Sequence, residues 1–154
     1  MMIKCTLNLD TPLGKMYLQG DDRYITALRF GEAEEDCPSP VLHMAEMQLE
    51  EYFSGSRTEF DLPLNPEGTE FQKSVWKALC EIPYGETATY GEIAAKIGNP
   101  GACRAVGMAN NRNPIAIIIP CHRVVGAGGS LTGYAGGLDK KEFLLKLEKK
   151  GAEL

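Results

Sequence analysis

The sequence lacks the features of a membrane or secreted protein. No apolar stretch approaches the roughly 18 residues that cross a bilayer, and the first residues lead into a polar, alternating segment instead of a signal peptide. The five cysteines are an odd number without paired spacing, which indicates reduced thiols and not a disulfide framework. We therefore expect a cytoplasmic protein with no membrane partner.

Metal ligands are also scarce, and the whole chain has two histidines. Cys5, Cys37 and His43 lie in the N-terminal third without the spacing of zinc ligands. We interpret these three residues as structural, and we expect neither a bound metal nor a cofactor.

Acidic residues are absent between Glu92 and Asp139, although the whole chain has a formal net charge of −5. The overall charge argues against nucleic acid as a partner, whereas this stretch holds only cations. Such a stretch fits a surface that faces a polyanion, and it equally fits a mostly buried segment. Its cations are Lys96, Arg104, Arg112 and Arg123.

The N-terminal part has the pattern of a small sheet with a helix. Apolar and polar residues alternate over 3–9 and 15–19 around a turn, and residues 24–30 read as a third strand. Apolar residues then recur at helical spacing over 41–53, up to the breaker Ser54-Gly55. The proline-rich stretch 61–66 predicts a boundary between a domain at 1–65 and a second at 66–154.

The second part has the pattern of a mostly helical domain. Capping boxes begin helices at Thr69 and Thr89, and a third helix is expected from about Ala102 to Asn110. The last two of these, joined by a tight glycine-containing turn, predict a helix-turn-helix. A final helix begins near Asp139 and should bury Phe143, Leu144 and Leu147. The fold class is therefore α/β, with a winged-helix-like C-terminal domain.

One cysteine follows the longest apolar run. Residues 115–119 lie between Pro114 and Pro120, and the run predicts a buried strand or extended segment that presents Cys121 at its edge. A thiol reacts as the thiolate, and His122 and Arg123 are groups that could tune it. The alternative is a buried structural cysteine.

The sequence PCHRVV at 120–125 resembles the active-site signature of the O6-alkylguanine-DNA alkyltransferases. The resemblance extends through RAVG at 104–107, NP at 113–114 and GYAGGL at 133–138 to Glu148, and covers about residues 69–150. It implies a ribonuclease H-like first domain and irreversible transfer of an alkyl group from O6-alkylguanine to Cys121, without cofactor. The implied partner is double-stranded DNA containing O6-alkylguanine, bound by a monomer in the cytoplasm, or at the nucleoid in a prokaryote.

The resemblance also implies the catalytic roles. His122 would act on the Cys121 thiol through a water, and Glu148 would orient His122 in the manner of a triad. On an extended segment neighbouring side chains point to opposite sides, so we expect His122 not to stack on the sulfur. Tyr90 would contribute its hydroxyl to the base and help to rotate the phosphate.

The helix expected from about Ala102 to Asn110 has mostly small side chains. By the same resemblance, it would enter the minor groove, and Arg104 would fill the gap left by a flipped guanine. The implied DNA contacts are Asn99, Ala102, Arg104, Ala105, Gly107, Arg112 and Arg123. The implied base pocket is formed by Tyr90, Asn113, Val124, Tyr134, Ala135 and Gly136. In that pocket the carbonyls of Cys121 and Val124 accept from the exocyclic amine, the Ala135 amide donates to the guanine oxygen, and Asn113 braces the turn before the apolar run. Many relatives carry serine at the position of Ala135.

Two other functions fit the same residues. A cysteine hydrolase or acyltransferase would use Cys121 and His122 but regenerate its thiol. Alkyltransferase-like proteins bind the same lesion without repairing it, and they carry tryptophan where this chain has Cys121.

Overall fold

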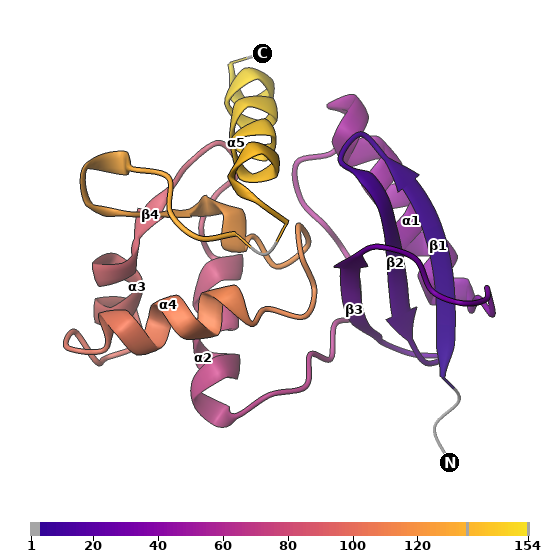
Figure 1. The fold of residues 1–154 in the computed structure, drawn as a ribbon, viewed down its shortest axis with the longest axis horizontal. Helices are drawn as coiled ribbons and strands as arrows, with labels where there is room; N and C mark the ends of the chain where they lie inside the picture. Colours follow the sequence, from indigo (N-terminus) through magenta and orange to yellow (C-terminus); the bar gives the residue numbers. More distant parts are fainter. Residues whose placement is uncertain (1–3, 135, 154) are drawn as a thin grey trace. The chain divides into compact units, whose positions relative to one another are not determined.

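The computed structural model describes residues 4–134 and 136–153. The chain divides into two compact units (Figure 1). The first extends to Glu67 and also includes Pro114–Ile118, and the second comprises Gly68–Asn113 together with the chain from Ile119 onward. The segment before the candidate nucleophile therefore belongs to the first unit, and the nucleophile itself belongs to the second.

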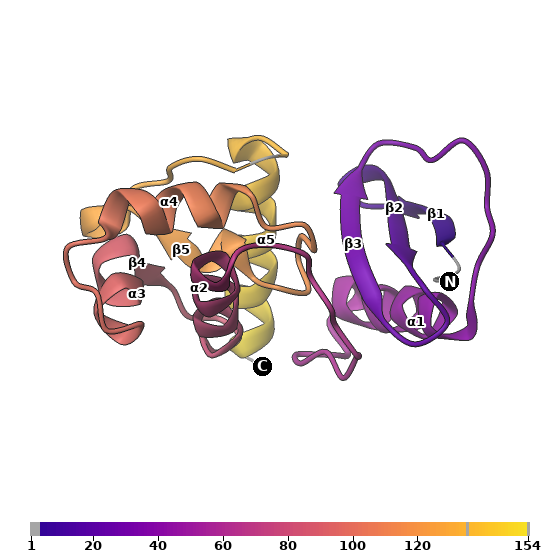
Figure 2. The ribbon, with the colours of Figure 1, turned by 90° about the horizontal axis from the view of Figure 1, so that it is seen from below.

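The first unit is an antiparallel sheet covered by a helix. Its strands β1 (Cys5–Thr11), β2 (Gly14–Gly20) and β3 (Ile25–Phe30) lie in the order β1-β2-β3. The alternation read from the sequence is confirmed, because every second residue of β1 from Cys5 to Leu9 is buried. Helix α1 (Pro40–Ser54) packs along one face of the sheet (Figure 2) and ends, as expected, at Gly55.

The strand predicted over 115–119 is wrong, although the segment is buried. Only Ile115 bridges to Leu28 of β3. The Ile118 amide then donates to the Ala116 carbonyl at 2.7 Å, which closes a γ-turn around Ile117 with a φ of 70°. An apolar run reports burial but not backbone shape, and a branched residue at positive φ is too rare to be expected from sequence.

The second unit is mainly helical. Its helices are α2 (Glu70–Cys80), α3 (Tyr90–Lys96), α4 (Cys103–Asn111) and α5 (Leu138–Ala152), with the short 3₁₀ turns η1 (Cys121–Arg123) and η2 (Ala127–Gly129). Strands β4 (Ala88–Thr89) and β5 (Val124–Val125) form a two-residue parallel pair. Both predicted capping boxes are present, at Thr69 and at Thr89. The expected helix pair of the helix-turn-helix is confirmed as α3 and α4.

The buried face of α5 differs from the prediction. Leu144 is buried as expected, but Leu147 is half-buried and Phe143 is exposed. Lys141 and Glu148 are buried instead, one turn before and one turn after Leu144. The helical spacing of these three residues places two charged side chains inside the unit. No helix within the described part of the chain is long and apolar enough to cross a membrane.

Candidate active site

A sharp turn presents Cys121 from the second unit. Pro120 has φ −80° and ψ 63°, and the Cys121 amide donates to the Ile119 carbonyl at 2.8 Å, which is the geometry of an inverse γ-turn. Residues 121–123 then form η1, so the expectation of an extended segment with neighbours on opposite sides is wrong here. In a 3₁₀ turn successive side chains are about 120° apart. The side chains of Cys121, His122 and Arg123 consequently point in three directions, and all three are buried.

Two asparagines brace this turn. Asn113 Nδ2 donates to the Ile119 carbonyl at 2.8 Å, and Asn110 Nδ2, from α4, approaches the Cys121 carbonyl at 3.4 Å. Helix α4 is fixed in turn by Trp76 of α2, whose buried indole donates to the Ala109 carbonyl at 2.8 Å. This contact of Asn113 lies at the turn after the apolar run, whereas we predicted that Asn113 braces the turn before it.

The thiol is held in its protonated form. Burial raises the pKa of Cys121 above its ordinary value, while a hydrogen bond from Asn113 and the positive charge of Lys141 act in the opposite direction. Because desolvation is the larger effect, the sulfur is a thiol at neutral pH. A reaction at this sulfur therefore needs a base.

The candidate base, His122, follows Cys121 in the chain, and its partner, Glu148, comes from α5. His122 Nε2 and Glu148 Oε2 are 2.6 Å apart, and both side chains are almost completely buried. Burial lowers the pKa of His122 and outweighs the opposing effect of Glu148. Within the described residues, His122 Nδ1 has no hydrogen-bond partner. The imidazole is thus neutral, oriented through Nε2, and able to use Nδ1 as a second polar atom.

Cys121, His122, Arg123 and Glu148 form one buried group of side chains, the Cys121 cluster. The position of Arg123 in this cluster argues against the DNA contact predicted for it. Its Nε donates to Glu148 Oε1 at 2.7 Å, and one terminal nitrogen donates to Glu148 Oε2 at 3.1 Å. The other terminal nitrogen donates to the Ile82 carbonyl at 2.6 Å. With its donors used internally and 7% of the residue exposed, Arg123 does not face a phosphate. Burial would raise the pKa of Glu148, but the hydrogen bonds and charges of His122 and Arg123 hold it at about 2.

Lys141 is the site residue that sequence reasoning missed. Its ammonium donates to the carbonyls of Val124 at 2.5 Å and Thr132 at 2.6 Å, and it is completely buried. It thereby ties the glycine-rich segment, which runs from Gly126 to Tyr134, to β5, the strand that follows the nucleophile. The signal that could have found it is the helical spacing to Leu144, which places Lys141 on the inward face of α5.

The residues expected to form the base pocket differ in their burial and in their hydrogen-bond partners. The Tyr90 hydroxyl is 2.8 Å from Thr132 Oγ1, so the start of α3 meets the glycine-rich segment. Tyr134 and Gly136 are half-buried, and burial raises the pKa of Tyr134, which keeps its hydroxyl neutral. Val124 is buried, and its carbonyl already accepts from Lys141. The expectation for the Ala135 amide lies outside the described residues.

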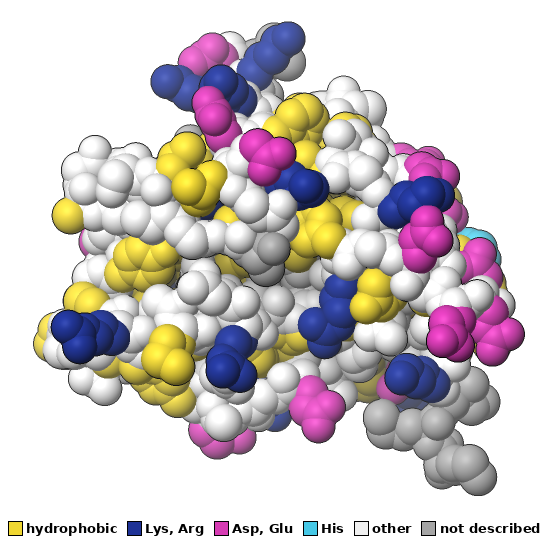
Figure 3. Space-filling model, viewed as in Figure 1, with side chains coloured by type: hydrophobic (Ala, Val, Ile, Leu, Met, Phe, Trp, Pro, Cys, Tyr) yellow, Lys and Arg dark blue, Asp and Glu magenta, His cyan; other side chains and the backbone are white. Residues whose placement is uncertain are grey.

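The expected DNA surface coincides with the outer face of α4. Arg104, Ala105 and Arg112 are exposed there, Asn99 is exposed in the preceding turn, and Ala102 and Gly107 are half-buried. Over α3 and α4, Figure 3 shows lysine or arginine side chains standing among apolar and uncharged ones. This face combines small side chains with separate cations, which suits a close approach to a polyanion.

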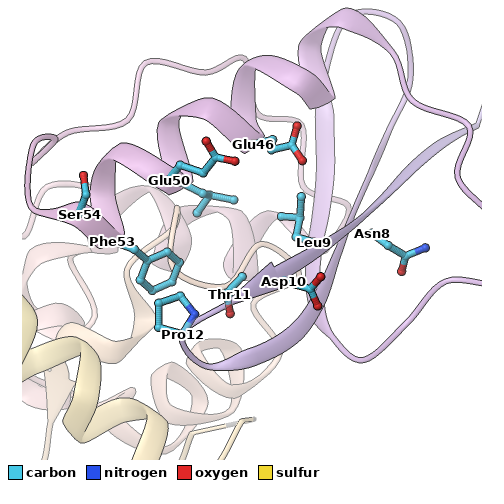
Figure 4. A pocket seen from close by; sticks show the side chains of 10 residues that line it. Asn8, Leu9, Asp10, Thr11, Pro12, Glu46, Glu50, Phe53 and Ser54 are labelled. Atoms are coloured by element: carbon cyan, nitrogen blue, oxygen red, sulfur yellow. The ribbon is translucent and has the colours of Figure 1, made fainter.

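Other parts of the described structure are weaker candidates for a functional site. Across residues 4–134 and 136–153, no three histidine, cysteine or acidic side chains gather as metal ligands would. The first unit has a cleft of about 560 Å³ between β1 and α1, where Asp10, Glu46 and Glu50 surround an apolar floor that includes Leu49 and Phe53 (Figure 4). The lining of that cleft includes no cysteine, histidine or lysine, so the Cys121 cluster is the stronger candidate for nucleophilic chemistry.

Comparison with known families matches both parts of the chain. Residues 3–66 match the family model described as "6-O-methylguanine DNA methyltransferase, ribonuclease-like domain". Residues 70–150 match the one described as "6-O-methylguanine DNA methyltransferase, DNA binding domain". The second match includes every residue of the Cys121 cluster.

Individual relatives agree over nearly the full length. The chain is 58% identical over 149 residues to the methylated-DNA--protein-cysteine methyltransferase of Methanosarcina barkeri, covering 92% of this chain and 94% of that protein. The crystal structure of Mycobacterium tuberculosis OGT in complex with DNA superposes with a TM-score of 0.88 at 53% identity, covering 95% of this chain and 93% of that one. The M. tuberculosis O6-methylguanine methyltransferase superposes with a TM-score of 0.87 at 51% identity, covering 96% and 94%.

Proposed function

Because the chain belongs to the 6-O-methylguanine DNA methyltransferase family, we propose that it repairs DNA by transferring an alkyl group from O6-alkylguanine to Cys121. The observation that carries this proposal is the buried Cys121 thiol beside a His122–Glu148 pair at 2.6 Å, inside the matched region. The protein is a methylated-DNA–protein-cysteine methyltransferase that acts once, because nothing in the cluster removes a thioether.

The reaction is a displacement at carbon. The Cys121 proton passes through a water to His122 Nδ1, and the sulfur forms a bond to the alkyl carbon as the bond from that carbon to the guanine oxygen breaks. The electron pair stays on the oxygen, the guanine anion takes a proton from water, and the imidazolium of His122 returns its proton to water. Glu148 keeps its charge and stabilises the imidazolium that forms, as the third member of a triad does.

The base reaches the sulfur by leaving the duplex. Cys121 is 6% exposed, so a stacked guanine cannot meet it, and α4 offers Arg104 to fill the gap that the flipped base leaves. Tyr90 and Tyr134 enclose the base, and the Tyr90 hydroxyl exchanges its bond to Thr132 for one to the guanine. Asn99, Ala102, Ala105, Gly107 and Arg112 complete the surface along the minor groove.

The two parts of the chain divide the work. Residues 66–154 carry the chemistry and bind DNA, and residues 1–65 support them. We also propose that the protein acts on DNA as a monomer in the cytoplasm, at the nucleoid if the cell is prokaryotic.

Stoichiometry separates this function from a hydrolase. With an excess of duplex containing O6-methylguanine, we expect one guanine restored per protein molecule and then no further reaction, because the thioether is permanent. The measurement is the amount of repaired oligonucleotide over time at several protein concentrations. Continued turnover would instead support a cysteine hydrolase that regenerates its thiol. Binding without any repair would support a lesion-binding protein.

A further inference from the structure

The buried Arg123 takes no part in the displacement described above. A guanidinium in the interior is costly unless its charge is paired, and pairing alone often gives little net stability. Here the side chain lies within the catalytic cluster and spends two of its donors on Glu148, the carboxylate that orients His122. The position of Arg123 therefore points to an effect on the protonation state of the His122–Glu148 pair.

The geometry makes Arg123 and His122 compete for one carboxylate. Glu148 Oε1 accepts from Arg123 Nε at 2.7 Å, while Oε2 accepts from both Arg123 at 3.1 Å and His122 Nε2 at 2.6 Å. A third bond, to the Ile82 carbonyl, fixes the planar guanidinium in this orientation. The negative charge of Glu148 is thus already balanced by a permanent cation before His122 takes up any proton.

Without that cation, Glu148 would favour a proton on His122 more strongly. A buried carboxylate facing only an imidazole favours the protonated imidazole, because opposite charges at short range stabilise each other strongly in a poorly solvated site. A protonated His122 cannot accept the proton of Cys121. Burial is the largest effect on the ring and already lowers the pKa of His122, and Arg123 acts in the same direction against Glu148, so the cation increases the share of His122 that is neutral.

Other groups near the cluster do not replace Arg123. Tyr84, in the turn after α2, lies under the guanidinium, and burial raises its pKa, as it does for Tyr134 of the glycine-rich segment and Cys80 of α2. These three groups are therefore neutral at physiological pH. Lys141 of α5 lowers the pKa of His122, but its hydrogen bonds go to the carbonyls of Val124 and Thr132.

We propose that Arg123 is a positioning residue that acts as the permanent counter-ion of Glu148, so that His122 rests as the neutral imidazole and can take the Cys121 proton. This inference rests on the proposed function for its purpose. The claim itself is about the protonation of His122 in the unreacted protein, so it can be tested without a substrate.

The test is an NMR titration of the histidine rings in the full-length protein. The chain has only two histidines, so few ring signals have to be told apart. His122→Ala assigns the signals. In the unchanged protein we expect His122 to remain neutral at neutral pH, because its pKa is lowered. A protonated His122 at neutral pH would overturn the proposal, with no variant needed.

Two substitutions then separate charge from packing. Arg123→Met removes the cation, and we expect the pKa of His122 to rise by about one unit or more, whereas Arg123→Lys keeps the charge and should leave the ring neutral. The second measurement is the rate of alkyl transfer from free O6-benzylguanine as a function of pH. At pH values below the pKa of His122, the rate of Arg123→Met should be about tenfold lower than that of the unchanged protein, because a higher pKa leaves less of the neutral ring. If Arg123→Met does not fold, Arg123→Gln replaces it as the variant that lacks the cation. An unchanged His122 titration in folded Arg123→Met would contradict the proposal even if alkyl transfer occurs.

Discussion

Replacing Arg104 by alanine is expected to slow the reaction with O6-methylguanine in duplex DNA by about 100-fold or more. The exposed side chain on α4 fills the space of the flipped guanine, and flipping costs a few kcal/mol, of which each 1.4 kcal/mol corresponds to about a factor of ten in rate. The reaction with the free base O6-benzylguanine needs no flipping and should stay nearly unchanged. Single-turnover rates with both substrates measure the difference.

Arg112→Ala is the matched control, because Arg112 is also an exposed cation and caps the C-terminal end of the same helix. A cation that only contacts phosphate should weaken all DNA binding about uniformly and reduce its salt dependence, without singling out the flipping step. If Arg104→Ala slowed both substrates equally, Arg104 would belong to the fold or the pocket, and its insertion into the duplex would have to be abandoned.

His122→Ala is expected to lower the alkylation rate by about 10²-fold to 10⁴-fold, the usual contribution of a positioned general base. Burial keeps Cys121 in the thiol form, so the loss of the base cannot be offset by spontaneous ionisation at neutral pH. Glu148→Gln should also slow the reaction strongly, because it removes the charge that stabilises the imidazolium. Binding to methylated duplex should remain nearly intact, since both residues are buried.

Glu142→Gln provides the control on the same helix, where Glu142 is exposed and pairs with Lys146. It should change neither the rate nor the binding. Equal losses of rate and of binding in His122→Ala or Glu148→Gln would mean that these residues hold the fold and do not activate the thiol. Near-ultraviolet circular dichroism of the buried Trp76 checks the fold of each variant.

The regular elements were predictable because their signals are local. Alternation gave the three strands of the first unit, and side-chain caps at Thr69 and Thr89 gave the starts of two helices. The turn around Ile117 was not predictable, since it depends on a bridge to Leu28, which is distant in the sequence. Phe143 was assigned to the interior on its apolar character alone, but it lies off the inward face of α5.

The candidate site was only partly accessible from the sequence. The PCHRVV motif pointed to Cys121 and His122, and the extended resemblance pointed to Glu148, which the structure brings to 2.6 Å from His122. Arg123 was misassigned and Lys141 overlooked for a common reason. A lone charge in a sequence is expected at the surface. Only the fold shows that Glu148 and backbone carbonyls, among them those of Ile82, Val124 and Thr132, compensate these two cations inside the second unit.

The most direct test is the mass of the intact protein after incubation with duplex DNA containing O6-methylguanine, followed by peptide mapping. The account predicts a gain of roughly 14 Da, one methyl in place of one hydrogen, on every active molecule and on Cys121 alone. Cys37, Cys80 and Cys103 are exposed thiols in the same chain and serve as internal controls for nonspecific alkylation. Methylation of any of these three, or of Cys5, in place of Cys121 would contradict the account, as would repaired DNA with an unmodified protein.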